Sequence, residues 1–243
     1  MGQDSGLGNS TPLSHRDQLI DKIIKAFELQ PPHKRLMVGI AGAPASGKST
    51  LADWLVERIN GDSPDTRPAV VVPMDGFHLD NAILDARGIR AVKGAPHTFD
   101  VVGFYSLLQR LSAPVSDYVD SSKSTNINVS EGSVYVPVFD RAMDLARCAA
   151  TAVDAHHRIV VVEGNYLLLN RPLWSGVSSC FDLTVSLDVP LATLEQRLIM
   201  RWIDHGFDEQ SATNRALSND IPNARVVTRE SSGAHFVLAS VRQ

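Results

Sequence analysis

The chain has 243 residues, of which 44% are hydrophobic and 21% are charged, so it can bury one sizeable core and needs no second domain. Its 23 basic and 27 acidic residues give a formal net charge of −4 without any block of basic residues. This balance argues against nucleic acid or a membrane surface as a partner, because both attract clusters of lysine and arginine.

The N-terminal segment and the two cysteines bear on the compartment in which we expect the protein to work. Residues 1–14 are polar, rich in Gly, Ser and Asn, and lack the apolar core of a signal peptide. We predict a disordered tail over 1–14 and a single domain over 15–243 in a cytoplasmic protein. Cys148 and Cys180 lie far apart without the spacing of metal ligands, so we expect both to be free and buried in a reducing compartment.

Segments rich in Val and Ile alternate with helical patterns along the domain. The predicted strands are 36–41, 69–74, 135–139, 159–162 and 181–187, and the predicted helices are 14–29, 48–60, 194–204 and 208–219, with a turn at 220–223. This alternation is typical of an α/β fold with a doubly wound, mostly parallel sheet and helices on both faces. A polar stretch at about 114–132 interrupts it, and we expect an exposed insertion there.

A phosphate-binding motif joins the first strand to the helix that follows it. Residues 42–49 read Gly-Ala-Pro-Ala-Ser-Gly-Lys-Ser and match the pattern G-x-x-x-x-G-K-[ST]. The glycines let successive backbone N–H groups point at phosphate oxygens, and the helix directs its positive end at the same anion. Lys48 should reach the β- and γ-phosphates, and Ser49 should offer its hydroxyl to Mg²⁺. The motif therefore predicts a nucleotide site.

Two acids follow predicted strands near that loop. Asp75 follows the strand at 69–74, and Glu163 follows the strand at 159–162. Ligands bind beyond the carboxyl ends of parallel strands, so both acids should meet the phosphate loop. Phosphoryl transfer to an alcohol needs one acid beside Mg²⁺ and another that takes the proton of the acceptor. We assign Asp75 as the base and Glu163 as the acid beside the metal, but the reverse assignment satisfies the same pattern.

Each acid also has a purely structural interpretation. Asp75 could form an Asx turn before Gly76, and Glu163 could be an acid at a helix N-terminus, where the helix dipole stabilises it.

A pair of arginines indicates a lid. Arg197 and Arg201 are four residues apart, so they lie on one face of the predicted helix. Lid arginines in kinases neutralise the charge that develops on the transferred group, and closure excludes water. We predict such a lid over about 194–219. The alternative is a solvated face on which these arginines pair with Glu195 and Asp204.

Taken together, these segments resemble the phosphoribulokinase/uridine kinase/pantothenate kinase family of P-loop kinases. The resemblance extends from about Leu36 to about Val227, and it is strongest to little-characterised bacterial-type kinases labelled as nucleoside/nucleotide or fructose-transport-associated kinases. It implies a P-loop NTPase fold of the nucleoside monophosphate kinase type. The motifs that carry it are residues 42–50, Met-Asp-Gly-Phe-His-Leu-Asp-Asn at 74–81 with Arg87-Gly88 and Lys93-Gly94, Tyr-Val-Pro-Val-Phe-Asp-Arg at 135–141, Val-Glu-Gly-Asn-Tyr-Leu-Leu-Leu at 162–169, and residues 197–206 with Asn219-Asp220.

The resemblance implies an ATP-dependent kinase that transfers the γ-phosphoryl group to a hydroxyl of a small metabolite, with Mg²⁺ as cofactor. A nucleoside, a sugar or a pantothenate-like alcohol is the implied class of acceptor. The implied catalytic residues are Asp75, Lys48, Arg197 and Arg201, and the implied metal-side residues are Ser49, Glu163 and Asp75. The implied ATP contacts are Gly42, Ala43, Pro44, Ala45, Ser46, Gly47, Lys48, Ser49, Thr50 and, from a loop near adenine, Asn223. The implied acceptor contacts are Asp75, His78, Lys93, Asp140, Arg141 and Asn165.

Several features leave the acceptor open. The insertion at 114–132 adjoins the implied acceptor side, and the chain lacks the pantothenate and uridine patterns beyond the shared residues. A P-loop ATPase or nucleotide switch acting on a protein partner would use the same loop without an acceptor pocket. A GTPase should show an Asn-Lys-x-Asp motif, which is absent from the sequence. Exposed sheet edges in this class also suggest a homodimer.

Overall fold

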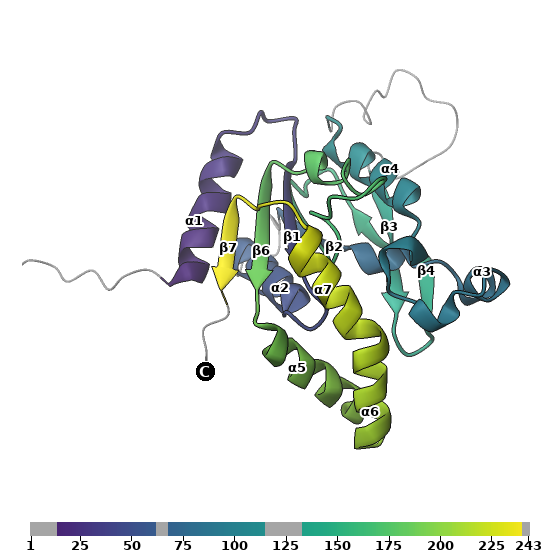
Figure 1. Ribbon diagram of the computed structural model, residues 1–243. Helices are drawn as coiled ribbons and strands as arrows, with labels where there is room; N and C mark the ends of the chain where they lie inside the picture. Colours follow the sequence, from purple (N-terminus) through teal and green to yellow (C-terminus); the bar gives the residue numbers. More distant parts are fainter. Residues whose placement is uncertain (1–13, 62–67, 115–132, 240–243) are drawn as a thin grey trace, which may run out of the picture.

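The computed structural model describes residues 14–61, 68–114 and 133–239 (Figure 1). A five-stranded parallel sheet forms its centre, in the order β2-β5-β1-β6-β7, and β3 and β4 form a separate antiparallel pair. The strands are β1 (Leu36–Gly42), β2 (Ala69–Pro73), β3 (Val134–Asp140), β4 (Leu145–Val153), β5 (Ile159–Gly164), β6 (Leu183–Asp188) and β7 (Phe236–Ala239). The α-helices are α1 (His15–Glu28), α2 (Lys48–Asn60), α3 (Asn81–Ala86), α4 (Val101–Ser112), α5 (Leu191–Asp204), α6 (Glu209–Arg215) and α7 (Ile221–Glu230).

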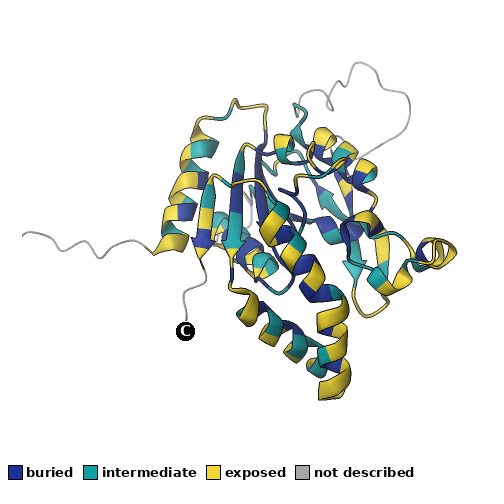
Figure 2. Cartoon of the chain, viewed as in Figure 1, coloured by how far each residue is buried: buried dark blue, intermediate teal, exposed yellow. Residues whose placement is uncertain are grey.

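The central strands separate two hydrophobic clusters. Successive side chains of a strand point to opposite faces, so Val38 of β1 packs with α1 and α2, whereas Met37 lies in the cluster that contains α4 and α7. Both β1 and β5 are buried along their whole length (Figure 2). Each fully buried Val or Leu contributes about 1.5–3 kcal/mol. The predicted fold, a doubly wound parallel sheet with helices on both faces, is confirmed.

Local signals set several boundaries where the sequence predicted them. Ser14 caps α1: its hydroxyl accepts from the backbone N–H of Asp17, and the Asp17 carboxylate accepts from the Ser14 N–H in return. The helix α2 runs from Lys48 to Asn60, as predicted. Ser14 therefore belongs to the folded domain, while the rest of the predicted tail, residues 1–13, lies outside the described residues.

The predicted turn at 220–223 is wrong. A π-helical turn, Ala216–Asp220, connects α6 to α7 without a break, and the N–H of Ile221 donates to the carbonyl of Ala216. Pro222 is the second residue of α7 and directly follows the π-helical turn, and the chain stays helical through this position.

Other differences concern single elements. The predicted strand at 135–139 is β3 of the antiparallel pair and not part of the central sheet, and the sequence did not predict β4, β7, α3 or α4. Both cysteines are free, but Cys148 is exposed on β4 and Cys180 is partly buried, so the prediction that both are buried is wrong. Residues 115–132 of the predicted insertion lie outside the described residues. Within the described part of the chain, every helix is too short or too polar to cross a bilayer.

Candidate active site

The phosphate loop has the backbone curvature that its sequence predicts. Ala45 and Gly47 take left-handed conformations, with φ of 61° and 93°, and the N–H of Ser46 donates to the carbonyl of Ala43. At Gly42 a Cβ atom would lie 2.5 Å from Oγ of Ser46 and 3.3 Å from its Cβ, so the loop packs closely against this glycine. This geometry directs the start of α2 at the space where a phosphate would bind.

Glu163 lies beside this loop because β5 pairs with β1. The register sets Glu163 opposite Ile40, just before the loop begins. Glu163 is 5% exposed and belongs to a strand, so its interpretation as an acid at a helix N-terminus is wrong. Burial raises the pKa of its carboxyl; the charge of Lys48 and a hydrogen bond from Ser49 oppose this shift, and the charge of Asp75 adds to it.

Three buried polar atoms near the loop lack hydrogen-bond partners among the described residues. They are Oγ of Ser46, Oε2 of Glu163 and Oδ1 of Asn165. A buried carboxylate without a full set of partners is costly unless a cation or a hydrogen-bond donor compensates it. Carboxylate and hydroxyl oxygens are the ligands that Mg²⁺ prefers, so Glu163 and Ser49 form a set of donors that fits Mg²⁺.

Asp75 lies at the same edge of the sheet. It occupies the 3₁₀ turn Met74–Phe77 directly after β2, whose Pro73 pairs with Glu163. Its Oδ2 accepts a 3.2 Å hydrogen bond from Nη2 of Arg141, and its Oδ1 has no hydrogen-bond partner among the described residues. The carboxylate does not bond the backbone of its own turn, so the Asx-turn interpretation is wrong.

The β3–β4 hairpin packs directly on the turn that carries Asp75. At Gly76 a Cβ atom would lie 2.2 Å from the carbonyl oxygen of Pro137 in β3. The absence of a side chain at Gly76 therefore allows the hairpin to approach and to bring Arg141 to Asp75.

His78 is fixed beside Asp75 in one tautomer. Its Nδ1 lies 2.7 Å from the carbonyl oxygen of Asp75, which can only accept, so Nδ1 carries the proton. The ring lies between Phe99 and Phe139, with centroid distances of 4.1 and 4.6 Å. Burial lowers the pKa of His78, although the nearby Asp75 opposes this shift. The imidazole is therefore neutral near pH 7 and keeps Nε2 as an acceptor.

The structure gives Lys93 partners within the protein. Its ammonium group donates to Oδ1 of Asn81 at 2.7 Å and to Oδ1 of Asp144 at 2.8 Å, and it lies over the ring of Phe139. The adjacent carbonyl of Gly94 accepts a hydrogen bond from the hydroxyl of Tyr166. Lys93 thus joins α3 to the hairpin, and its implied contact with the acceptor stays a prediction.

Asp140 also has partners within its own hairpin. Its Oδ1 accepts from the backbone N–H groups of Ala142 and Met143, both at 3.1 Å, and its Oδ2 lies 3.6 Å from Nε of Arg147. These bonds fix the turn that carries Arg141, so Asp140 holds the backbone of this turn in place. Its contact with the acceptor stays a prediction.

The two arginines of the predicted lid make different contacts. Nη1 of Arg197 donates to the carbonyl of Ala45 in the phosphate loop at 3.3 Å. Arg201 lies 3.4 Å from the buried carboxylate of Asp220. The predicted alternative pairing of these arginines with Glu195 and Asp204 is therefore wrong. Asp220 was not predicted as a partner of Arg201, because their separation of 19 residues corresponds to no helical or strand spacing.

Asn223 does not lie in a loop, contrary to prediction. It is buried in α7, and its Nδ2 donates to Oδ1 of Asn219 at 3.2 Å. A contact between Asn223 and adenine stays a prediction that this position does not favour.

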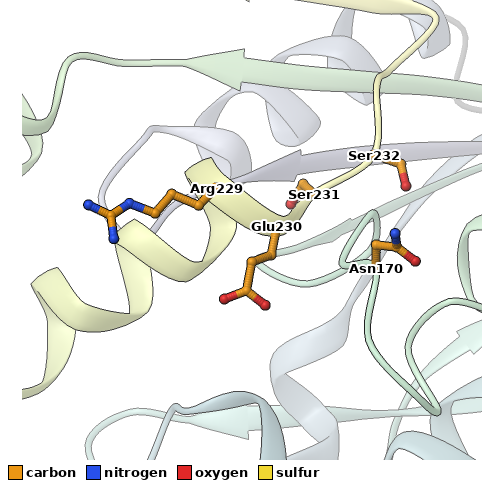
Figure 3. A pocket seen from close by; sticks show the side chains of 5 residues that line it. All are labelled: Asn170, Arg229, Glu230, Ser231 and Ser232. Carbon is orange, nitrogen blue, oxygen red and sulfur yellow. The ribbon is translucent and has the colours of Figure 1, made fainter.

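Two cavities lie away from these residues. One of about 260 Å³ is at the C-terminal end of α7 (Figure 3), and Glu230, which lines it, pairs with Arg171. Its lining consists of Asn170, Arg229, Glu230, Ser231 and Ser232. A second, of about 390 Å³, is lined by residues of α1 and α2: Asp17, Ile20, Asp21, Ile24, Arg58 and Ile59. Neither contains a residue of the candidate site.

Comparisons with known proteins bear on the whole chain. No family model matches it. It is 31% identical over 236 residues to a protein of Schizosaccharomyces pombe whose proposed activity is uridine kinase, covering 95% of this chain and 92% of that protein. It is 32% identical to the uncharacterized protein YggC of Escherichia coli, with coverage of 89% and 82%. It is also 32% identical to a pantothenate kinase of Bradyrhizobium, over 76% of this chain and 56% of that protein.

Solved structures agree with these relatives. A protein from Silicibacter whose proposed activity is that of a fructose transport system kinase superposes with a TM-score of 0.79 and 37% identity, covering 93% of this chain and 99% of that one. YFH7 of Saccharomyces cerevisiae, a proposed P-loop containing kinase with a circular permutation, gives a TM-score of 0.76 at 18% identity, covering 94% of this chain and 99% of that one, and so agrees in fold.

Proposed function

The chain belongs to the phosphoribulokinase/uridine kinase/pantothenate kinase family of P-loop kinases, and we propose that it is an ATP-dependent kinase that phosphorylates a hydroxyl of a small metabolite. One observation carries the proposal: the phosphate loop, Glu163 and Asp75 meet at one edge of the sheet. A phosphoryl-transfer site needs this combination of an anion cradle, an acid beside the metal and a base.

The nucleotide side uses the loop and the lid. Backbone N–H groups of the loop at 42–50, other than that of Ser46 and the missing one of Pro44, bind phosphate oxygens, and Lys48 compensates charge on the β- and γ-phosphates. Ser49 and Glu163 would hold Mg²⁺, which when bound neutralises phosphate charge. Arg197 already reaches the carbonyl of Ala45, so its guanidinium lies close to the loop from the lid side.

The environments of the two acids support distinct roles. Glu163 is almost fully buried next to Lys48, and its Oε2 lacks a partner among the described residues, which suits an acid that faces a cation. The Asp75 side chain is 19% exposed and lies under the hairpin. Arg141 occupies Oδ2 of Asp75, so Oδ1 is the oxygen that would accept the proton of the acceptor hydroxyl.

The acceptor side favours a hydroxyl compound with further hydrogen-bond donors. Neutral His78 offers Nε2 as an acceptor, and the cation of Arg141 lies beside the base. A nucleoside, a sugar and a pantothenate-like alcohol each meet this requirement. The geometry therefore supports a class of acceptor, a polar hydroxyl compound, and does not select one compound within it.

The experiment is Mg²⁺-dependent ADP release by the purified protein across a panel of nucleosides, sugars, pantothenate and glycerate. We expect one compound to stimulate ADP release. The Asp75→Asn protein should bind ATP with unchanged affinity in calorimetry and lose that stimulation by at least about a hundredfold.

Two outcomes would contradict the proposal. A flat panel with steady background hydrolysis would favour a P-loop ATPase or nucleotide switch that acts on a protein partner. Stimulated turnover of Asp75→Asn within a few-fold of the unmodified protein would assign the base elsewhere.

A further inference from the structure

We propose that Asn219 and Asp220 are positioning residues that hold the nucleotide side and the acceptor side of the site from a single helical turn. This inference rests on the proposed kinase function. Both residues end the π-helical turn Ala216–Asp220, which joins the lid helices to α7. Their side chains reach different parts of the protein, one toward α5 and one toward the segment that carries Lys93.

Asp220 holds the lid arginine. Its side chain is 13% exposed; Oδ2 accepts from Nε1 of Trp202 at 2.7 Å, and Oδ1 accepts from Nη2 of Arg201 at 3.4 Å. A buried carboxylate requires such donors, so it fixes the orientation of both residues on α5. Arg197, one turn earlier on the same face, contacts the phosphate loop. Asp220 therefore sets how α5 presents its arginines to ATP.

Asn219 holds the other side. Its Nδ2 donates to the carbonyl of Lys93 at 2.8 Å, and its Oδ1 accepts from Asn223. The side chain of Lys93 in turn lies over Phe139, which stacks on His78 beside the candidate base. A continuous series of contacts thus leads from Asn219 to the residues that would meet the acceptor.

The backbone geometry supports a specific role for this turn. A π-helical turn is rare, and it adds one residue to the helical register. Here it lies where adjacent side chains must reach α5 and the Lys93 segment at once. A regular α-helical register would change which direction each of them faces, and the two contacts could then not both be kept.

The test separates the two sides by measuring ATP binding and acceptor use independently. Asp220→Asn keeps an acceptor for Trp202 but removes the charge that faces Arg201. We expect the ATP Kd, measured by calorimetry without acceptor, to rise about tenfold, as for loss of one charge-assisted hydrogen bond. The KM for the most active compound of the acceptor panel should stay within twofold.

Asn219→Ala should give the converse result. The KM for that compound should rise about tenfold, while the ATP Kd stays within twofold, because the substitution removes the hydrogen bond to the Lys93 carbonyl and leaves Arg201 with its partner. Hydrogen exchange of residues 90–98 should also become faster in this variant and stay unchanged in Asp220→Asn. Ser218→Ala is the matched control, because Ser218 is exposed on the same turn and, among the residues that the structure describes, its hydroxyl bonds only the carbonyl of Arg215. Both constants should stay unchanged in this variant.

A double-mutant cycle tests directly whether Asp220 acts on ATP binding through Arg201. Arg201→Ala combined with Asp220→Asn should raise the ATP Kd no more than Arg201→Ala alone; additive effects would overturn the inference. Equal changes of both constants in both variants would also overturn it. If the unmodified protein binds ATP and phosphorylates an acceptor, but the two variants do not change the ATP Kd and the acceptor KM separately, only this inference is refuted. If the unmodified protein binds no ATP, the proposed function is refuted as well.

Discussion

Arg141 and Asp75 lie 66 residues apart in the chain, yet the guanidinium of one donates to the carboxylate of the other at 3.2 Å. The arginine follows β3, and the acid follows β2. The hairpin therefore supplies a cation to the candidate base. Among the described residues of the central sheet, none donates a hydrogen bond to this carboxylate. This contact orients the carboxylate by occupying one of its two oxygens.

Removing that cation should impair turnover more than binding. The Arg141 side chain is 63% exposed, so as a simple ion pair it would contribute no more than about 1 kcal/mol. For Arg141→Ala we expect kcat to fall at least about tenfold with the KM for ATP unchanged, because the base loses its orientation. Steady-state kinetics measure this. Arg225→Ala, at an exposed position of α7, is the control and should keep kcat; an equal loss of kcat in both variants would contradict the orienting role of Arg141.

Lys48→Ala should abolish phosphoryl transfer and leave the fold intact. Lys48 begins α2 beside Glu163 and is partly exposed, so its removal creates no large cavity. Coupled ADP release and thermal unfolding check the two parts of this prediction. Lys25→Ala, at an exposed position of α1, should retain full activity. An active Lys48→Ala protein that binds ATP normally would exclude the proposed site.

Glu163 should make stability depend on pH with a defined sign. Because the pKa of its carboxyl is raised in the folded protein, the folded chain holds this proton to higher pH than the unfolded chain. The contribution of Glu163 to stability is full below its ordinary pKa of 4.5 and is lost as pH rises through the raised value. Without Mg²⁺, Glu163→Gln should therefore have the higher Tm at about pH 7, and the difference should vanish at about pH 4.

The same variant tests the metal. Addition of Mg²⁺ with ATP should raise the Tm of the unmodified protein more than that of Glu163→Gln, because the amide supplies no charge to a cation. Glu57→Gln, at an exposed position of α2, should respond like the unmodified protein. An equal increase of Tm in all three proteins would assign the metal to other residues.

Gly76→Ala should weaken the contact between the hairpin and the candidate base. The added Cβ would lie 2.2 Å from a backbone oxygen of Pro137, which cannot rotate away as a side chain would. We expect a loss of about 1–3 kcal/mol in the free energy of unfolding, with a fall in kcat. Urea denaturation measures the first effect. Gly233→Ala, where a Cβ meets nothing within 4 Å, is the control, and a similar loss there would contradict the steric explanation.

The sequence was sufficient where local signals and burial patterns coincide. The glycines and lysine of the phosphate loop, the boundaries of α2 and the apolar run 159–162 of β5 are encoded over a few residues each. It was insufficient for β7, which has four residues and partly exposed side chains. It was also insufficient for the π-helical turn, because Pro222 led us to predict that the helix ends there. A proline in the first turn of a helix and one in a loop look alike in a single sequence.

The partners of the site residues were harder to predict than the residues themselves. Lys93 and Asp144 are 51 residues apart, and Arg201 and Asp220 are 19 apart, so no helical or strand period relates them. Packing of the hairpin and the lid brings them together, and packing has no short sequence pattern. A homodimer, a cytoplasmic location and the lack of nucleic acid partners stay predictions.

The position of β1 has a consequence for the order in which the site can form. Its hydrogen-bonding neighbours are β5 and β6, both from the second half of the chain. A ribosome synthesises the phosphate loop early, but the strand that supports the loop has no neighbour until Ile159 and the residues after it have been made. Closing such a long loop is slow and entropically costly. Nucleotide binding at the loop would therefore require that β5 and β6 have been synthesised and have paired with β1.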